Sequence, residues 1–330
     1  MDNVNDFFAT LSSYLWGWPM IVLLLGTHVF LSVRLRFPQR KLFTAIRLSV
    51  QRDKSQKGDV SQFGALATAL AATIGTGNII GVATAVALGG PGAVFWCWLT
   101  GVFGISTKYS EALLAIKYRV KSEKGHMLGG PMYTLERGLG WRKMGILFAV
   151  FTAIAAFGIG CTVQANAIST IMHASYGIST SVSGAVLMLL AAAVILGGVR
   201  SISKVCSMLV PFMALLYVLG CIYILCMNVV YIVPALKLIV NSAFSPEAAG
   251  GGLAGGSVIM AARYGIARGL FSNESGLGSA PIVAAAARTK NPVRQALVSS
   301  TGTFWDTVVI CALTGLVIVS SIIAYPDIDY

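Results

Sequence analysis

Long apolar runs, separated by short polar or basic segments, occupy most of the chain. A helix needs roughly 20 apolar residues to cross the hydrocarbon of a bilayer, and these runs are continuous, unlike the alternating segments of membrane barrels. The pattern predicts an all-α polytopic membrane protein whose residues 1–330 form a single transmembrane domain. About eight transmembrane helices are expected, at 14–33, 62–88, 92–116, 145–172, 181–199, 207–227, 251–288 and 297–324.

Two of these runs are interrupted at their centres by glycine and polar residues. The second contains ATIGTGNIIG at 72–81, and the seventh contains RGLFSNESGLGSA at 268–280. Free backbone groups in hydrocarbon cost several kcal/mol each, so such breaks persist only where a ligand or neighbouring protein satisfies them. Four uninterrupted runs lie between the two breaks, so the interrupted runs cross in opposite directions. This pattern predicts a transporter built from inverted repeats, with its binding site at the breaks.

The repeat pattern also divides the chain into regions. Residues 1–61 are expected to form an extra N-terminal helix and a basic inner loop, and 62–227 the first five-helix repeat. Residues 228–250 are expected to form an outer loop or surface helix, and 251–330 the start of the second inverted repeat. Within the first loop, LFTAIRLSVQR is either a short amphipathic helix on the inner surface or a solvated loop.

The composition and the placement of charge agree with a membrane protein. The chain is 56% hydrophobic and 11% charged, whereas soluble domains are about a quarter charged. Of the 24 Lys and Arg residues, 20 lie in four alternate loops: eight in 34–60, seven in 117–143, two in 200–206 and three in 288–295. This positive-inside pattern places those loops in the cytoplasm and the N-terminus outside. It explains the net charge of +12 without a nucleic-acid partner.

The first break offers groups for both an amino acid and a cation. Gly75 and Gly77 let the backbone approach a ligand closely. The N–H groups that begin the second half-helix can hold a carboxylate. The oxygens of Thr73, Thr76 and Asn78 suit a hard cation such as Na⁺. We expect Gly75 to Asn78 to bind substrate, and Thr73, Thr76 and Asn78 to bind the ion.

The second break repeats this combination. Phe271 could form an apolar wall that limits the size of the substrate side chain. Glu274 is an acid within or near the membrane; it is either an ion or proton site or the partner of Arg263 or Arg268. The remaining candidates for substrate contacts are Ser272, Asn273 and Ser275. Asn273 is also a candidate ion ligand.

Other polar residues lie inside the apolar runs. Gln164 either binds the substrate or forms an interhelical hydrogen bond, and Asp306 could contribute to an ion site or brace one. Lys108 and Glu111 are spaced i,i+3 and are expected to pair. Gly81 is expected to serve only the close packing of helices. The chain contains no nucleophile–base pair or metal-ligand cluster, so we do not expect an enzyme.

Three long segments resemble the alanine/glycine:cation symporter family, the sodium:alanine symporters. They are ALATALAATIGTGNIIGVATAVALGGPGAVFWCW, GGPMYTLERGLG and RGLFSNESGLGSAPIVAAAARTKNPVRQALVSSTGTFWDT. The resemblance implies a leucine-transporter-like fold and Na⁺-coupled uptake of alanine or glycine across a prokaryotic inner membrane. It also implies that GTGN, Gln164 and FSNE (Phe271 to Glu274) contribute to the site. Family members have an extra helix and a ten-helix core, so the last three core helices are expected to be missing here.

The leading hypothesis is therefore sodium-coupled symport of alanine, glycine or both, with no cofactor beyond the coupling ion. Proton coupling through Glu274 is one alternative. A fragment that inserts into the bilayer but does not transport is another. The sequence leaves open the choice between alanine and glycine, L/D selectivity, ion stoichiometry and oligomeric state.

Overall fold

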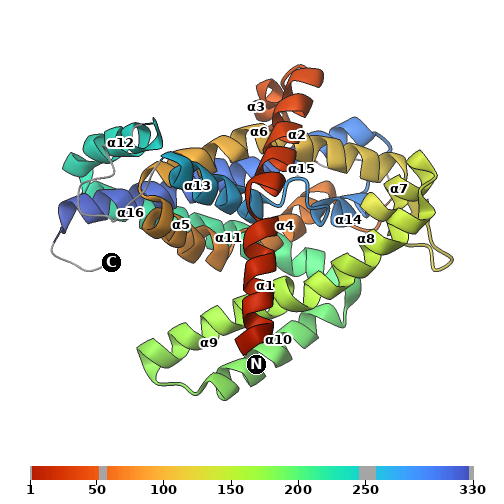
Figure 1. The fold of residues 1–330 in the computed structure, drawn as a ribbon. Helices are drawn as coiled ribbons and strands as arrows, with labels where there is room; N and C mark the ends of the chain where they lie inside the picture. Colours follow the sequence, from red (N-terminus) through yellow and green to blue (C-terminus); the bar gives the residue numbers. More distant parts are fainter. Residues whose placement is uncertain (1, 52–57, 245–257, 327–330) are drawn as a thin grey trace.

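The computed structural model describes residues 2–51, 58–244 and 258–326, and these are almost entirely helical (Figure 1). The first part comprises α1 (Asp2–Leu15), α2 (Trp18–Arg34), a 3-10 turn (Pro38–Lys41), α3 (Leu42–Val50), α4 (Gln62–Thr73), α5 (Thr76–Gly89) and α6 (Gly92–Lys117). A short hairpin of β1 (Val120–Lys121) and β2 (Met127–Leu128) leads to α7 (Pro131–Leu139). The middle comprises α8 (Arg142–Ala155), a π-helical segment (Ala156–Thr162), α9 (Val163–Tyr176), α10 (Thr180–Ile195), α11 (Gly198–Met227) and α12 (Val229–Phe244). The last part comprises α13 (Val258–Asn273), α14 (Ala280–Ala285), α15 (Pro292–Thr303), a second π-helical segment (Phe304–Cys311) and α16 (Ala312–Ala324).

Local capping and turn chemistry explains several of these boundaries. The Ser61 side chain accepts a hydrogen bond from Gly64 N at 2.9 Å, which caps the start of α4. The Asn291 side chain caps α15 in the same way, with Pro292 as the first helical residue. Between α5 and α6, Gly90 has φ +74°, a conformation that favours glycine. The segment GGPG at 89–92 thus forms a tight turn between these two helices.

The expected number of spans is not confirmed. Within the described residues, four helical stretches are long and apolar enough to cross a membrane, or up to five if the bent pair α4–α5 is one span. Two predicted spans, at 181–199 and 251–288, contain helices of only 16 residues, α10 and α13. Residues 251–257 lie outside the described ranges. The span at 92–116 is the 26-residue helix α6, which carries Lys108 and Glu111.

Other predicted segments differ mainly in their ends. The first apolar run was expected to begin near residue 14, but the structure has an additional helix, α1, before α2. The basic residues expected in a loop at 200–206 lie in the first turns of α11, which begins at Gly198. Leu42–Val50 of the segment LFTAIRLSVQR form α3, so the helical alternative is confirmed, and α12 forms the expected helix in 228–250. Residues 245–250 lie outside the described ranges.

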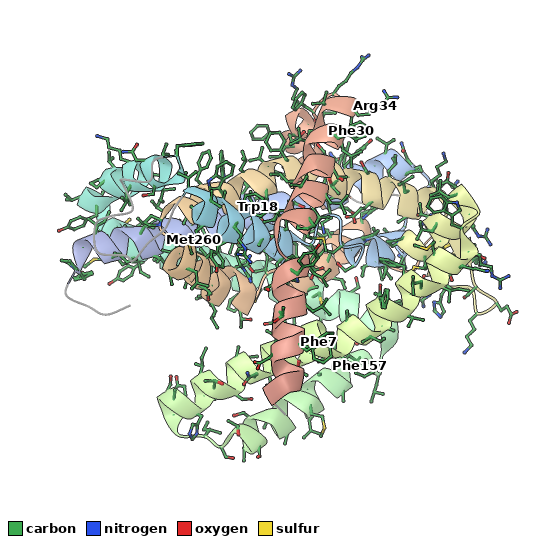
Figure 2. The ribbon with its side chains drawn as sticks, in the orientation of Figure 1. Phe7, Trp18, Phe30, Arg34, Phe157 and Met260 are labelled. Carbon is green, nitrogen blue, oxygen red and sulfur yellow. The ribbon has the colours of Figure 1, made fainter. Side chains whose placement is uncertain are left out.

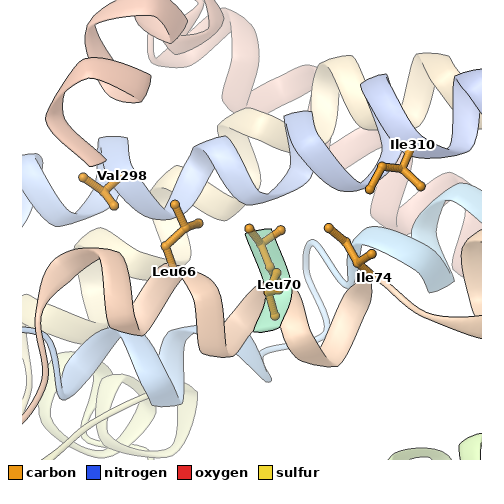
Figure 3. Packing of buried hydrophobic residues seen from close by; sticks show 6 residues of the cluster. Leu66, Leu70, Ile74, Val298 and Ile310 are labelled. Atoms are coloured by element: carbon orange, nitrogen blue, oxygen red, sulfur yellow. The ribbon is translucent and has the colours of Figure 1, made fainter. Parts of the chain in front are cut away.

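Helix α6 lies at the centre of the molecule and packs against α2, α12, α13, α14, α15 and the second π-helical segment. Leu66 and Leu70 of α4, together with Ile74 just after it, face Val298 and Ile310 in a buried cluster (Figure 3). This cluster packs the first half of the second run against the eighth run.

Much of the outer surface is apolar, as expected for a chain surrounded by lipid. Phe7, Phe30 and Phe157 are 63%, 63% and 79% exposed and point outward (Figure 2). The α9–α10 pair stands apart from the other helices (Figure 1), and the most apolar part of the stretch Arg142–Tyr176 contains no buried residue. These exposed apolar helices indicate a multi-pass membrane protein.

The start of α4 and the end of α14 are joined through their backbones. Asp59 N and Val60 N donate to Ala286 O at 2.8 and 3.2 Å, and Arg288 N donates to Val60 O at 2.8 Å. The Asp59 carboxylate also accepts from Met127 N of the hairpin at 2.8 Å. The segment that precedes α4 is thus hydrogen-bonded directly to the segment that follows α14.

Arg119, just beyond α6, reinforces this junction. Its guanidinium donates to three carbonyl groups at the end of α14 and just after it, those of Ala285, Ala287 and Thr289. Partial burial lowers the pKa of Arg119, and the nearby charge of Asp59 opposes that shift. One side chain therefore fixes the segment that leads from the seventh run to the eighth.

Candidate functional site

The first break lies where the sequence predicts it. Helix α4 ends at Thr73, α5 begins at Thr76, and the two axes meet at 41°. The intervening Ile74 and Gly75 are extended. Gly75 N donates to Asn78 Oδ1 at 2.9 Å, so the asparagine side chain reaches back to cap the start of its own half-helix.

Asn78 also connects the first break to two other runs. Its Nδ2 donates to Asp306 Oδ1 at 2.7 Å and lies 3.2 Å from Ser272 Oγ. Ser272 Oγ donates to Asp306 Oδ2 at 3.0 Å, and Thr307 Oγ1 donates to the same oxygen at 2.7 Å. Asn78, Ser272 and Asp306 are 1%, 4% and 0% exposed. A closed, buried polar network therefore joins α5, α13 and the second π-helical segment.

Gln164 of α9 faces the first break. Its Oε1 accepts a hydrogen bond from Thr76 Oγ1 at 2.7 Å. A Cβ on Gly75 would lie 3.3 Å from the same oxygen, so the glycine makes room for this side chain. Asn166, a polar residue of the same run, is exposed, and its Oδ1 accepts a hydrogen bond from Thr170 on its own helix.

The second break is also confirmed, between the end of α13 at Asn273 and the start of α14 at Ala280. Glu274, Gly276 and Gly278 have φ values of +52°, +92° and +84°, so the chain turns through three left-handed residues in five positions. Asn273 Oδ1 accepts from Ser275 N at 2.9 Å. Ser275 Oγ lies 3.1 Å from the hydroxyl of Thr303 and is fully buried.

Neither the expected Lys108–Glu111 pair nor the alternative pairing of Glu274 with an arginine forms within the described residues. Glu274 accepts a hydrogen bond from Ser279, and neither Arg263 nor Arg268 pairs with it in the described residues. Glu111 accepts from Gly276 N at 3.2 Å, while the buried Lys108 Nζ has no hydrogen-bond partner among those residues. The i,i+3 spacing permitted a Lys108–Glu111 pair, but the second break supplies Glu111 with a backbone donor instead.

The candidate residues form two groups. Gly75, Thr76, Asn78, Gln164 and Ser272 come together with Asp306. A second group lies along the turn of the second break, with contacts at Thr303 or Ser279: Asn273, Glu274 and Ser275. Outside both groups, Thr73 Oγ1 contacts only Leu70 O of its own helix among the described residues, at 3.4 Å.

Arg268 and Asp306 have a larger part in the site than the sequence indicates. Arg268 Nη2 donates to Gly77 O, and the guanidinium lies 5.1 Å from the centre of the Phe271 ring. Gly81 was expected to serve only helix packing, but a Cβ there would lie 2.0 Å from Arg268 Cζ, so this glycine also makes room for the arginine side chain. The available signal was charge: ionisable residues inside a membrane are functional by default.

No cluster of His, Cys, Asp and Glu suited to a resident metal occurs within the described parts of the chain. The groups around the first break are hydroxyl, amide and backbone oxygens, with one carboxylate at Asp306. Such oxygens can bind a small zwitterion or a weakly held alkali cation.

Comparisons with known proteins identify the family. The model of the sodium:alanine symporter family matches residues 1–328. The sodium/alanine symporter AgcS of Methanococcus maripaludis is 53% identical over 327 residues, covering 97% of this chain and 71% of its own. An uncharacterized transporter of Haemophilus influenzae is 52% identical over 319 residues, covering 96% of this chain and 70% of its own. These matches do not support the expectation that three core helices are missing.

Proposed function

This chain belongs to the sodium:alanine symporter family, and on that premise we propose that it couples the uptake of alanine, and of glycine, to the inward movement of Na⁺. The family and the relatives are transporters, so the chain is an amino-acid symporter in a membrane and not an enzyme. The coupling ion, the second substrate and the residues of the site are parts of the proposal. The inverted-repeat fold of the leucine-transporter kind, with its division of the chain, also stays a prediction.

The observation that carries the proposal is the buried link from Asn78 to Ser272 and Asp306. It places both interrupted runs and the eighth run around one polar centre. In transporters of this type, free backbone N–H groups at a broken helix hold the substrate carboxylate, and free oxygens hold the cation. We assign the substrate to Gly75 through Asn78, Gln164, Phe271, Ser272, Asn273 and Ser275.

For the coupling ion we propose Thr73, Thr76, Asn78, Asn273 and Glu274 as the ligand set. Most of these offer neutral oxygens, which favours Na⁺ over a proton. The name of AgcS, a sodium/alanine symporter, supports the same ion and substrate. Phe271 and the small residues around the breaks favour alanine or glycine over an amino acid with a bulky side chain.

A proton-coupled mechanism is the second candidate, because two carboxylates lie at the second break. Glu111 bonds Gly276 N and Glu274 bonds Ser279, and the two acids interact electrostatically. Either could carry a proton through the transport cycle.

The proposal also includes the location of the protein. We place it in a prokaryotic plasma membrane, with the N-terminus outside and the basic loops cytoplasmic.

The test is uptake of labelled alanine into proteoliposomes that hold the purified chain. An inward Na⁺ gradient should drive accumulation, replacement of Na⁺ by choline at fixed pH should abolish it, and unlabelled glycine should compete. Uptake that is unchanged in choline but follows a proton gradient would replace the first candidate with the second. Absence of uptake under both gradients, with AgcS active in parallel, would leave only the non-transporting alternative.

A further inference from the structure

Arg268 is a cation of α13 that lies between the two breaks without a carboxylate partner. No ion pair joins it to an Asp or Glu among the described residues. Its Nη2 donates to Gly77 O, whereas its Nε is shielded from solvent and has no hydrogen-bond partner in the described chain. A positive charge at membrane depth is costly and is ordinarily paired. Within the described residues, the charge of this guanidinium is therefore unpaired and at least one of its N–H groups has no acceptor.

The first broken run makes room for this side chain. Added Cβ atoms at Gly77 and Gly81 would lie 2.5 Å from Arg268 Nη2 and 2.0 Å from Cζ. These two glycines are spaced i,i+4, so they lie on the same face of α5. Together they form a shallow groove that any larger residue would fill. The guanidinium therefore lies directly against the first turns of α5, where free backbone N–H groups begin a half-helix.

The orientation of the guanidinium is fixed from a second side. It lies 5.1 Å from the centre of the Phe271 ring, which itself packs edge-on against Trp16 at 5.7 Å. A guanidinium stacked on an aromatic ring keeps its edge N–H groups available for a planar acceptor. Since one of these groups bonds Gly77 O, the others remain for a ligand at the break.

Two opposite charges thus contact consecutive residues of the first break. Arg268 bonds Gly77, Asp306 bonds Asn78, and the two charged groups do not form an ion pair with each other. Asp306 is already satisfied by three side chains, whereas Arg268 is not. An amino acid is a zwitterion, and its carboxylate is the group that complements the unused charge.

We propose that Arg268 binds the carboxylate of the transported amino acid and thereby selects substrates with a free carboxyl group. The inference rests on the proposed function, because it assigns one specificity-determining residue to that same site. Guanidinium and carboxylate match in a planar, two-point geometry that glutamine does not reproduce and lysine reproduces only in charge. The remaining substrate contacts come from the first break itself.

The experiment compares binding of alanine and of alaninamide, in which a neutral amide replaces the carboxylate. Affinities are measured by isothermal titration on the purified full chain, for the parent, Arg268→Gln and Arg268→Lys. Arg263→Gln is the matched control, because Arg263 lies on the same helix and its guanidinium is placed over Tyr264. The parent should prefer alanine, and Arg268→Gln should bind alanine about 10- to 100-fold more weakly. Alaninamide binding should change little, so the preference should collapse, and Arg268→Lys should retain part of it.

The possible results distinguish a failure of the Arg268 proposal from a failure of the proposed function. An unchanged alanine preference in Arg268→Gln would overturn the inference, as would equal weakening of both ligands, which marks a purely structural role. If the glutamine variant does not fold, an undiminished preference in Arg268→Lys would overturn it equally. A parent that binds neither alanine nor glycine would overturn the proposed function together with the inference. A loss confined to alanine in the Arg268 variants, with Arg263→Gln unaffected, would support both.

Discussion

The substitution Asn78→Ala tests the buried network that joins the two breaks. It removes the donor to Asp306 Oδ1 at 2.7 Å and the acceptor of Gly75 N at 2.9 Å, both at a residue that is 1% exposed. A hydrogen bond to a charged group contributes about 1.5–3 kcal/mol, and loss of a helix cap costs about 0.5–2 kcal/mol. We expect the free energy of unfolding to fall by about 2–4 kcal/mol.

The size of the effect also reports the charge of Asp306. Interhelical hydrogen bonds between side chains within membranes contribute about 0.6 kcal/mol on average. A neutral bond and the helix cap together account for at most about 2.6 kcal/mol, so a loss above about 3 kcal/mol indicates an ionised acceptor. The assay is unfolding of the purified chain in mixed micelles, followed by tryptophan fluorescence as the denaturing detergent fraction is raised. Asn166→Ala is the control, because Asn166 is exposed and its hydrogen bond within the described residues is with Thr170 of its own helix.

A double-mutant cycle with Asp306→Asn isolates the pair. Residues that share one hydrogen-bond network show coupling energies of about 0.5–3 kcal/mol. A coupling below about 0.5 kcal/mol would refute the network, because the two changes would then be independent. The same refutation would follow if Asn78→Ala were no less stable than Asn166→Ala.

Three further substitutions test other contacts of the site. Gly81→Ala would place a methyl group 2.0 Å from Arg268 Cζ, so thermal unfolding should show a loss of about 1–3 kcal/mol, whereas Gly220→Ala, with nothing within 4 Å, should be neutral or stabilising; equal effects would contradict the groove on α5. Arg119→Ala removes three hydrogen bonds to carbonyl groups at the end of α14 and just after it. Amide hydrogen exchange at residues 285–289 should accelerate, and the free energy of unfolding should fall by about 1.5–3 kcal/mol. Unchanged exchange at these residues would count against the contact. Gln164→Ala removes the hydrogen-bond partner of Thr76 at the first break, so the alanine concentration for half-maximal uptake should rise about tenfold. An unchanged half-saturation concentration would exclude Gln164 from the site.

The sequence predicted the two breaks because their cause is local. Closely spaced glycines and short polar side chains weaken a helix at the centre of an apolar run, and the helices end at Thr73 and Asn273, within the two stretches that the sequence marks. Three positive φ values at the second break follow from the same residues. Span ends were less accurate, because the polar residues of α1 and the basic residues at the start of α11 continue a helix into regions that hydropathy alone excludes.

The partners of charged residues could not be predicted from spacing. Lys108 and Glu111 have the separation of a helical ion pair, yet Glu111 bonds the backbone of a run more than 160 residues away in the sequence. Asp306 is bonded by Asn78 of α5 and Ser272 of α13, which approach it only when the chain has folded. The two π-helical segments, which widen the helices near Gln164 and around Asp306, also lack a local sequence signal. Such contacts are decided by tertiary packing, which one sequence does not specify at this level.

The backbone junction between residues 58–60 and 286–288 has a mechanical consequence. Because its hydrogen bonds connect main chain to main chain, we expect the first half of one interrupted run and the last half of the other to move together as one body. A rotation of α4 is then expected to carry α14 with it. The non-helical residues at 74–75 and 274–279 are then the joints at which this body pivots against α5 and α13.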